Sequence, residues 1–361
     1  MRRQAAAALA VLTTLVATSC VTPPPPAATP PPPASTSAVP SLTPSAPETP
    51  RATPNPVVPI GLTVMTYNTL TGRNDCAGCT ALKRAGLGDE LKLSRRMPVV
   101  AEKVRLADPD LIGFQENEGP DPRPQIHLAK LLPDYTWVNP DATIPIAVRS
   151  SRFTVAESGV DVLEAEPLAC ISRDRTDGRY VSWARLHDAD TGRDFWLFNT
   201  HLHPYDTAAC AKLRAENVRL LAELVAAKNP DGELPQLIIG DFNAFGDEDR
   251  AGFTDHLTTL ASLGMADTAT MAERDSSDVP GADSAGWMRA TVKGRSEVKV
   301  VRTDGRYVDF IWVPKGTAVE EWGIWSGPGI ERRTIRGVEV PVWSGVMGSD
   351  HSPVVARLRL A

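Results

Sequence analysis

Several short apolar runs in this chain end in side chains that can perform acid–base chemistry or bind a metal. The clearest is the run at 237–239, which is followed by Gly240, Asp241 and Asn243. A short apolar run bounded by glycine is typical of a buried strand, and residues two apart on a strand point to the same face. We therefore expect Asp241 and Asn243 to lie side by side at a polar reaction centre. Because Asp, Asn and Gly also favour turns, this stretch alone fits a simple turn equally well.

Other apolar segments carry the same kinds of side chain, which strengthens the first interpretation. Their acids, amides and histidines are Asn68, Glu116, His201, Asp309, Asp350 and His351. Buried charges are costly unless they are paired or bind a metal, so folding alone gives no reason for so many of them. We expect these side chains to converge on one site.

The elements that would position them belong to one domain that reaches the end of the chain. Helices are predicted at 94–106, 124–132, 207–227 and 255–263. Ser94 is the expected cap of the first helix. Strands are predicted at 62–67, 110–114, 143–149, 153–163, 180–187, 195–200, 237–239, 307–313, 319–324 and 353–360. The stretch at 266–306 is rich in Gly, Asp and Ser and has little periodicity, so we predict mostly loop there.

The motifs occur in an order that resembles a known superfamily. They are Thr66-Tyr67-Asn68, Gly113-Phe114-Gln115-Glu116, Asn199-Thr200-His201-Leu202, Gly240-Asp241-Phe242-Asn243-Ala244, Val308-Asp309-Phe310-Ile311 and Ser349-Asp350-His351-Ser352-Pro353. Over roughly 62–360 the chain resembles the endonuclease/exonuclease/phosphatase superfamily, which is typified by DNase I. The resemblance implies an α/β fold, a four-layer α/β-β/α sandwich with the site at one end of two packed sheets. It also implies Mg²⁺-dependent hydrolysis of a phosphate ester.

The same resemblance implies a cation site. Glu116 is the natural ligand, because hard cations take carboxylate oxygens and water. Asn68 would lie beside it, and Asp350 would contribute a further oxygen. The expected cation is Mg²⁺, with Mn²⁺ as the alternative. Asn68 could equally be a residue that only forms hydrogen bonds at the end of its strand.

The remaining residues would handle protons and the phosphate group. Asp241 would orient or deprotonate the attacking water, and Asn243 would fix the direction of that water or hold a phosphate oxygen. His351 would contact the phosphate, and Asp309 would bind its far ring nitrogen, which raises the pKa of the histidine and fixes its tautomer. His201 would be a second phosphate contact or the acid that protonates the leaving oxygen. Asp309 could instead be a supporting hydrogen bonder, and His201 a core histidine.

The first 20 residues resemble an export signal. Two arginines precede a short apolar core at 5–16, and the sequence Ala-Thr-Ser at 17–19 before Cys20 resembles a bacterial lipobox. On this interpretation Cys20 is lipidated and anchors an exported protein to the membrane. The alternative is an ordinary signal peptide with a chance cysteine, and a secreted protein. Residues 21–58 are rich in Pro, Ala, Ser and Thr and predict an extended tether, which leaves 59–361 as the catalytic domain.

The other four cysteines predict disulfides, because their number is even and the chain is expected to be exported. Cys76 and Cys79 are close enough for a local bridge, which would leave Cys170 to pair with Cys210. Other pairings stay open. A zinc site is the less favoured alternative, because no histidine has finger spacing.

The composition narrows the function. The 361 residues carry a formal net charge of −6, which argues against a non-catalytic DNA-binding module but not against an enzyme with a bound cation. We favour an exported monomeric phosphodiesterase of the nuclease type, whose substrate would be a phosphate ester such as nucleic acid. One alternative is a phosphomonoesterase or lipid-headgroup hydrolase acting on inositol phosphates or sphingomyelin. The other is a catalytically inactive surface-binding protein with the same fold.

Overall fold

The structure, a computed structural model, describes residues 58–73, 79, 83, 88–119, 122–163, 170, 179–204, 207–245, 255–285, 287–292 and 296–361. The predicted signal peptide, Cys20, Cys76 and almost all of the predicted tether lie outside these residues. The described residues belong to a compact unit, Pro56–Ala361. In this described part of the chain, no helix is both long enough and apolar enough to cross a membrane.

Seven strands form the first sheet, in the order β10-β14-β17-β1-β2-β4-β3. Their bounds are β1 (Ile60–Asn68), β2 (Leu111–Gln115), β3 (Tyr135–Val138), β4 (Ile146–Arg149), β10 (Arg274–Asp275), β14 (Ala318–Ile324) and β17 (Val354–Leu360). β1 is central, parallel to β2 and antiparallel to β17. Most of β1 and all of β2 are buried, which explains why apolar residues predominate in both.

Six strands form the second sheet, in the order β5-β6-β7-β8-β13-β9. Their bounds are β5 (Phe153–Leu163), β6 (Arg179–Asp188), β7 (Arg193–His201), β8 (Gln236–Asp241), β9 (Met265–Asp267) and β13 (Asp309–Pro314). Gly240, near the end of β8, has a φ of +145°, and a Cβ there would lie 2.1 Å from the carbonyl oxygen of Thr200. Only glycine fits this close approach, which places Asp241 at the end of the strand.

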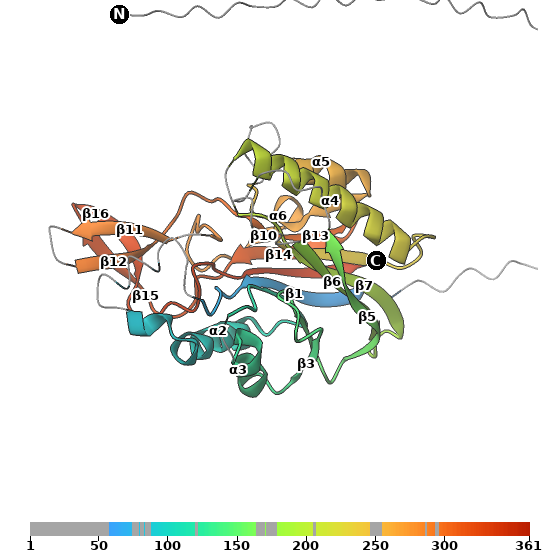
Figure 1. Ribbon diagram of the computed structural model, residues 1–361, viewed down its shortest axis with the longest axis horizontal. Coiled ribbons are helices and arrows are strands. Elements are labelled where there is room, and N and C mark those ends of the chain that lie inside the picture. The colour runs from blue at the N-terminus through green and yellow to red at the C-terminus, as the bar shows by residue number, and fades with distance from the viewer. Residues whose placement is uncertain are drawn as a thin grey trace, which may run out of the picture. The chain divides into compact units, whose positions relative to one another are not determined.

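The two sheets pack face to face, and helices cover their outer faces. The helices are α2 (Leu93–Ala107), α3 (Pro124–Leu131), α4 (Ala208–Lys228) and α5 (Asp255–Ser262). A large apolar core that includes Val64, Leu197 and Ile311 fills the space between the sheets. Figure 1 shows α2 and α3 on one side of the strands and α4 and α5 on the other, in agreement with two further apolar clusters beneath these helices. The predicted four-layer α/β-β/α sandwich is confirmed.

The prediction that 266–306 is mostly loop is wrong. Elements within it are α6 (Thr268–Met271), β10, β11 (Trp287–Val292) and β12 (Ser296–Val301). The hairpin β11–β12 joins a second hairpin, β15 (Ile330–Ile335) and β16 (Val338–Trp343), in a separate four-stranded sheet. Because β12 pairs with a strand that lies much later in the chain, the local pattern of the sequence did not indicate the sheet.

The cap predicted for the first long helix is also wrong. α2 has Lys92 as its N-cap, which makes no side-chain capping hydrogen bond, and Ser94 lies inside the helix. Burial of Met97, Val100 and Val104 against the first sheet stabilises the helix instead. A buried apolar face therefore outweighs the missing cap here.

The start of α4 is held by a cap and by a disulfide. The side chain of Thr207 accepts a hydrogen bond from the backbone N–H of Cys210. Cys210 also forms the predicted disulfide with Cys170. Cys79 is disulfide-bonded as well, but Cys76 lies outside the described residues, so the pairing of these two stays a prediction.

Candidate active site

Three of the predicted residues meet at one end of the second sheet. His201 and Asp241 are the last residues of the parallel strands β7 and β8, and the register places them opposite each other. Asp309 begins β13 and is the antiparallel partner of Asp241. The two neighbouring strands therefore place His201 and Asp309 on either side of Asp241.

Asn68 connects this group to the first sheet. It ends β1, and its Nδ2 donates hydrogen bonds to Glu116 Oε1 and to Asp241 Oδ2, both at 3.0 Å. The backbone N–H of Leu70 donates to Asn68 Oδ1 at 3.0 Å, which fixes the orientation of the amide. A single buried amide thus joins a carboxylate of one sheet to a carboxylate of the other.

Glu116 is held in a strained but well-supported position directly after β2. Its backbone has a φ of +60°, which is uncommon for a residue other than glycine. The backbone N–H of Thr71 donates to Glu116 Oε2 at 2.7 Å. Burial raises the pKa of Glu116, and the nearby charge of Asp350 raises it further. A divalent cation between these acids would remove both penalties, so the donor set fits such a cation.

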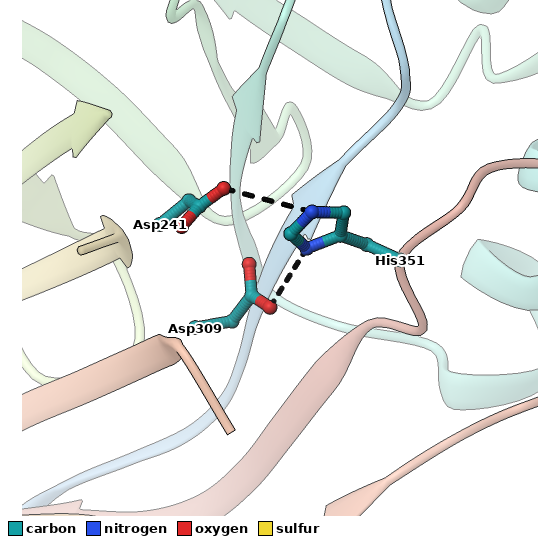
Figure 2. A group of neighbouring side chains, drawn as sticks. All are labelled: Asp241, Asp309 and His351. Atoms are coloured by element: carbon teal, nitrogen blue, oxygen red, sulfur yellow. Dashed lines mark hydrogen bonds and ion pairs between the residues drawn. The ribbon is translucent and has the colours of Figure 1, made fainter. Parts of the chain in front are cut away.

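His351 lies between two aspartates. Its Nδ1 is 3.0 Å from Asp309 Oδ2, and its Nε2 is 3.7 Å from Asp241 Oδ2. Figure 2 shows the ring between the two carboxylates. Burial alone would lower the pKa of His351, but the charges of Asp309 and Asp241 outweigh burial and raise the pKa well above its usual value. At neutral pH the ring is therefore an imidazolium that both aspartates stabilise.

The same three side chains are close enough to hold a metal ion, because one ligand atom from each lies within 4.8 Å of the others. A metal would need the neutral imidazole, whereas the flanking aspartates favour the protonated ring.

Asp241 has the most contacts within the group. Its Oδ1 accepts the backbone N–H of Asn243 at 2.8 Å, and its Oδ2 lies 3.5 Å from His201 Nε2. Burial raises the pKa of Asp241 to about 7, and the charge of Asp309 acts in the same direction. A carboxylate with a pKa near neutrality can accept a proton efficiently at physiological pH.

Asn243 is close to Asp241 but does not extend the strand. β8 ends at Asp241, and Asn243 has a φ of +50°. Its Nδ2 donates to the carbonyl oxygen of Leu202 at 2.9 Å. The expectation that a shared strand would align Asp241 and Asn243 is therefore wrong. A turn connects them, and the side-chain amide of Asn243 is tied to the backbone.

His201, the last residue of β7, and His203, two residues later, are both buried. Burial lowers the pKa of His201 well below its usual value, and the positive charge of Arg179 lowers it further. The same two causes, with Arg214, lower the pKa of His203 to about 3. Both rings are therefore neutral at pH 7. A neutral His201 is better suited to donate a hydrogen bond to the phosphate than to act as a general acid.

The loop before β17 carries Asp350 and His351 to the site. Ser349 Oγ donates to the carbonyl oxygen of Asn68 at 2.7 Å and accepts the backbone N–H of His351 at 3.1 Å. Asp350 is half-buried and acts electrostatically on both Glu116 and His351. All the predicted site residues in the described part of the chain thus gather in one place, while Cys20 lies outside it.

Two features of the site were missed in the sequence. Gln115 Nε2 donates to Asn199 Oδ1 at 2.8 Å, and Asn199 Nδ2 donates to the carbonyl oxygen of Phe114 at 2.9 Å, which joins β2 to β7 behind the site. Arg96 is buried on α2 beside the site loops. The spacing of the sequence could have indicated that Arg96 is buried, because it lies four residues before Val100 on the apolar face of the helix.

Comparison with known proteins agrees with this geometry. Residues 65–351 match the model of the Endonuclease/Exonuclease/phosphatase family. An endonuclease/exonuclease/phosphatase family protein from Bacteroides thetaiotaomicron is similar, with 22% identity and a TM-score of 0.60 over 84% of this chain and 99% of that chain. A mannosyl-6-phosphatase from the same organism has 22% identity and a TM-score of 0.57 over 82% of this chain and 99% of that chain.

A more distant similarity is to the catalytic domain of human Nocturnin with bound sulfate, with 18% identity and a TM-score of 0.51 over 82% of this chain and 94% of that chain. No curated protein matches the chain. At these identities the solved structures show a shared fold, whereas the family model covers most of the chain. The chain therefore belongs to the endonuclease/exonuclease/phosphatase family.

Proposed function

We propose that the protein is an exported, cation-dependent hydrolase of phosphate esters, and first of all a phosphodiesterase of the nuclease type. One observation carries the proposal. The Asn68 amide holds Glu116 of one sheet and Asp241 of the other at 3.0 Å each. The imidazolium of His351 lies 3.7 Å from the same Asp241 oxygen that accepts from Asn68. An acid that can hold a cation and a positive group that can bind a phosphate are thus both adjacent to one carboxylate, that of Asp241.

Glu116, with Asp350 and Asn68 nearby, would hold Mg²⁺, or Mn²⁺ as the alternative. When bound, such a cation neutralises charge on the phosphate and polarises its oxygens. Asp350 raises the pKa of Glu116, so the two acids repel each other when ionised. This repulsion is a reason for a divalent cation to bind between them.

Asp241 would remove a proton from the attacking water. Burial, with the charge of Asp309, brings its pKa to about 7, so the carboxylate is partly ionised at physiological pH and basic enough to accept a proton. The Asn68 amide and the backbone N–H of Asn243 each bind one of its oxygens. These two bonds fix the carboxylate in the orientation that the reaction requires.

His351 would bind a phosphate oxygen through its Nε2–H, because Nδ1 is engaged by Asp309. Its positive charge would stabilise the negative charge that develops on the phosphate in the transition state. His201, which is neutral, would add a second hydrogen bond to the phosphate or to the leaving oxygen. Proton acceptance by Asp241 and charge stabilisation by His351 are then separate tasks of neighbouring residues.

A specific observation supports one alternative to a phosphodiesterase. The similar mannosyl-6-phosphatase acts, by its name, on a phosphate monoester, which supports a phosphomonoesterase as the second candidate. The net charge of −6 also favours a small phosphate ester over long nucleic acid. Inositol phosphates and sphingomyelin are further candidates, and an inactive surface-binding protein is the non-enzymatic alternative.

A substrate panel tests these proposals with purified protein. Plasmid DNA, RNA, bis-p-nitrophenyl phosphate, mannose 6-phosphate, an inositol polyphosphate and sphingomyelin would each be incubated with Mg²⁺, Mn²⁺ or EDTA. We expect cation-dependent cleavage of diesters. Turnover of monoesters alone would overturn the phosphodiesterase proposal in favour of the second candidate. No turnover of any substrate would favour the binding protein.

We also propose that the chain is exported, lipidated at Cys20 and held on a tether at 21–58 as a monomer. The proposal is supported by the apolar core and the small residues that precede Cys20. Cell fractionation of the wild type and the Cys20→Ala variant tests the anchor, and we expect the variant to leave the membrane fraction. A variant that stays with the membrane would contradict it, and light scattering of the released domain would check the monomer.

A further inference from the structure

Arg96 is the largest fully buried side chain in the described part of the chain. A guanidinium has five N–H donors in a planar fork. Here all five donate to backbone carbonyl oxygens, with distances of 2.9 Å to Leu91, 2.6 Å to Thr69, 3.0 Å to Leu70, 3.3 Å to Thr71 and 3.1 Å to Gly348. The side chain therefore connects α2 to two loops that are distant from each other in the sequence.

The first of these loops, 69–71, orients the residues that we assign to the cation. Its Thr71 N–H donates to Glu116 Oε2 at 2.7 Å, and its Leu70 N–H donates to Asn68 Oδ1 at 3.0 Å. Leu70 has a φ of +57°, a backbone conformation that residues other than glycine rarely adopt. Because this conformation is unfavourable in isolation, the loop needs an outside contact, and Arg96 provides it.

The second loop brings His351 to the site. Gly348, which accepts from Arg96, directly precedes Ser349. Ser349 in turn bonds both to the backbone of Asn68 and to the N–H of His351. One guanidinium therefore touches both the loop that orients Glu116 and the loop that carries His351.

The charge of Arg96 supports the same arrangement. Burial lowers its pKa to about 10, while the negative charges of Asp350 and Glu116 act in the opposite direction. The guanidinium therefore stays protonated at neutral pH. It provides a fixed positive charge behind the two acids.

We propose that Arg96 is a positioning residue, which holds the Glu116 side and the His351 side of the site at a fixed separation and so presets the cation site. The inference rests on the proposed function, because it assigns Glu116 to a cation. Lysine cannot replace this residue, since a single ammonium has three donors on a compact head and cannot span carbonyl groups of both loops.

The test is cation binding by the folded protein without substrate. Mn²⁺ would be titrated by calorimetry and by electron paramagnetic resonance into the wild type, Arg96→Lys and the control Arg95→Lys, whose side chain is exposed on the same helix. We expect Arg96→Lys to weaken Mn²⁺ binding by about 10–100-fold, the usual effect of losing support around a metal ligand. The control should bind like the wild type. A lower melting temperature with unchanged Mn²⁺ affinity would show a purely structural role and overturn the inference.

A second variant disturbs the same contact from the other end. A Cβ at Gly348 would lie 3.1 Å from both Tyr67 Oη and Val100 Cγ2, so Gly348→Ala would require a small shift of these neighbours or of the backbone whose carbonyl accepts from an intact Arg96. We expect weaker Mn²⁺ binding here too, and this variant decides the matter if Arg96→Lys does not fold. Wild-type affinity in Gly348→Ala would then overturn the inference. If Glu116→Gln also binds Mn²⁺ like the wild type, the proposed cation site is wrong rather than only the role of Arg96.

Discussion

Nδ1 of His351 lies 3.0 Å from Oδ2 of Asp309, and both side chains are buried where the two sheets meet. The contact joins a loop before β17 to the first residue of β13. It fixes which ring nitrogen faces the site, because Nδ1 is engaged and Nε2 points towards Asp241. The positive end of the site therefore depends on a carboxylate that would not touch the substrate.

Replacing Asp309 with asparagine should lower activity with little loss of stability. Asn keeps the shape of the side chain but removes its charge, so burial would lower the pKa of His351 and the ring would lose its proton more readily. We expect kcat to fall by about 10²–10³-fold. NMR titration of the imidazole measures the pKa directly. The matched control is Asp194→Asn, which disrupts the more exposed pair with His187 and should leave kcat unchanged. Equal activity in both variants would contradict the role of Asp309.

The Asn68→Ala variant tests the bridge between the sheets. Hydrogen bonds from Asn68 lower the pKa of both Glu116 and Asp241, in opposition to burial. Their loss should shift the acidic limb of the pH–activity profile upwards and lower kcat/KM by about 10–100-fold. Asn229→Ala, which removes an amide at the end of α4, should reduce stability without moving that limb. If the acidic limb of the pH–activity profile is unchanged in Asn68→Ala, the hydrogen bonds of Asn68 do not set the pKa values of Glu116 and Asp241.

The raised pKa of Asp241 predicts a pH dependence of stability in cation-free protein. The folded value of about 7 lies above the unfolded value near 4, so the folded state binds more protons between these limits. Stability is therefore lost as the pH rises through this window, by about 2–3 kcal/mol between pH 5 and 8. Urea unfolding at both pH values measures this loss, and Asp241→Asn should reduce it. A variant with the same pH dependence as the wild type would contradict the assignment.

The Cys170–Cys210 disulfide should stabilise the domain through the loop that it closes. The two cysteines are 40 residues apart, and a loop of this length corresponds to about 4 kcal/mol of unfolding free energy in the chain-entropy model. The double variant Cys170→Ser/Cys210→Ser, unfolded in urea, should show a loss of this order while retaining activity at low temperature. An unchanged unfolding midpoint would show that the bridge adds nothing.

The sequence predicted those parts of the fold in which local pattern and tertiary environment agree. The largely apolar runs at β1, β2 and β8 are buried strands, because strands with both faces covered need apolar residues over most of their length. The acids, amides and histidines near their ends could be recognised because folding gave no other reason to bury them. Their convergence was therefore predictable, although the distances between them were not.

The parts that could not be predicted depend on partners far away in the sequence. β11 and β12 form a hairpin, and it becomes part of a four-stranded sheet only because β12 also pairs with β16, far away in the sequence. Arg96 appears in the sequence as an ordinary helix residue, and its five carbonyl partners become visible only once α2 packs beside the site loops. Asn243 followed a strand pattern, but a positive φ turns it away from the strand. In each case a tertiary contact or a turn determines the local structure, which the sequence pattern alone does not specify.

The most direct test of the central claim is the rate of bis-p-nitrophenyl phosphate hydrolysis by the wild type and Asp241→Asn, each with Mg²⁺ and with EDTA. We expect turnover by the wild type that requires Mg²⁺, and a loss of about 10²-fold or more in Asp241→Asn, because the variant cannot accept the proton of the attacking water. Equal rates for the two proteins, or wild-type turnover that EDTA leaves unchanged, would contradict a cation-dependent phosphodiesterase centred on Asp241.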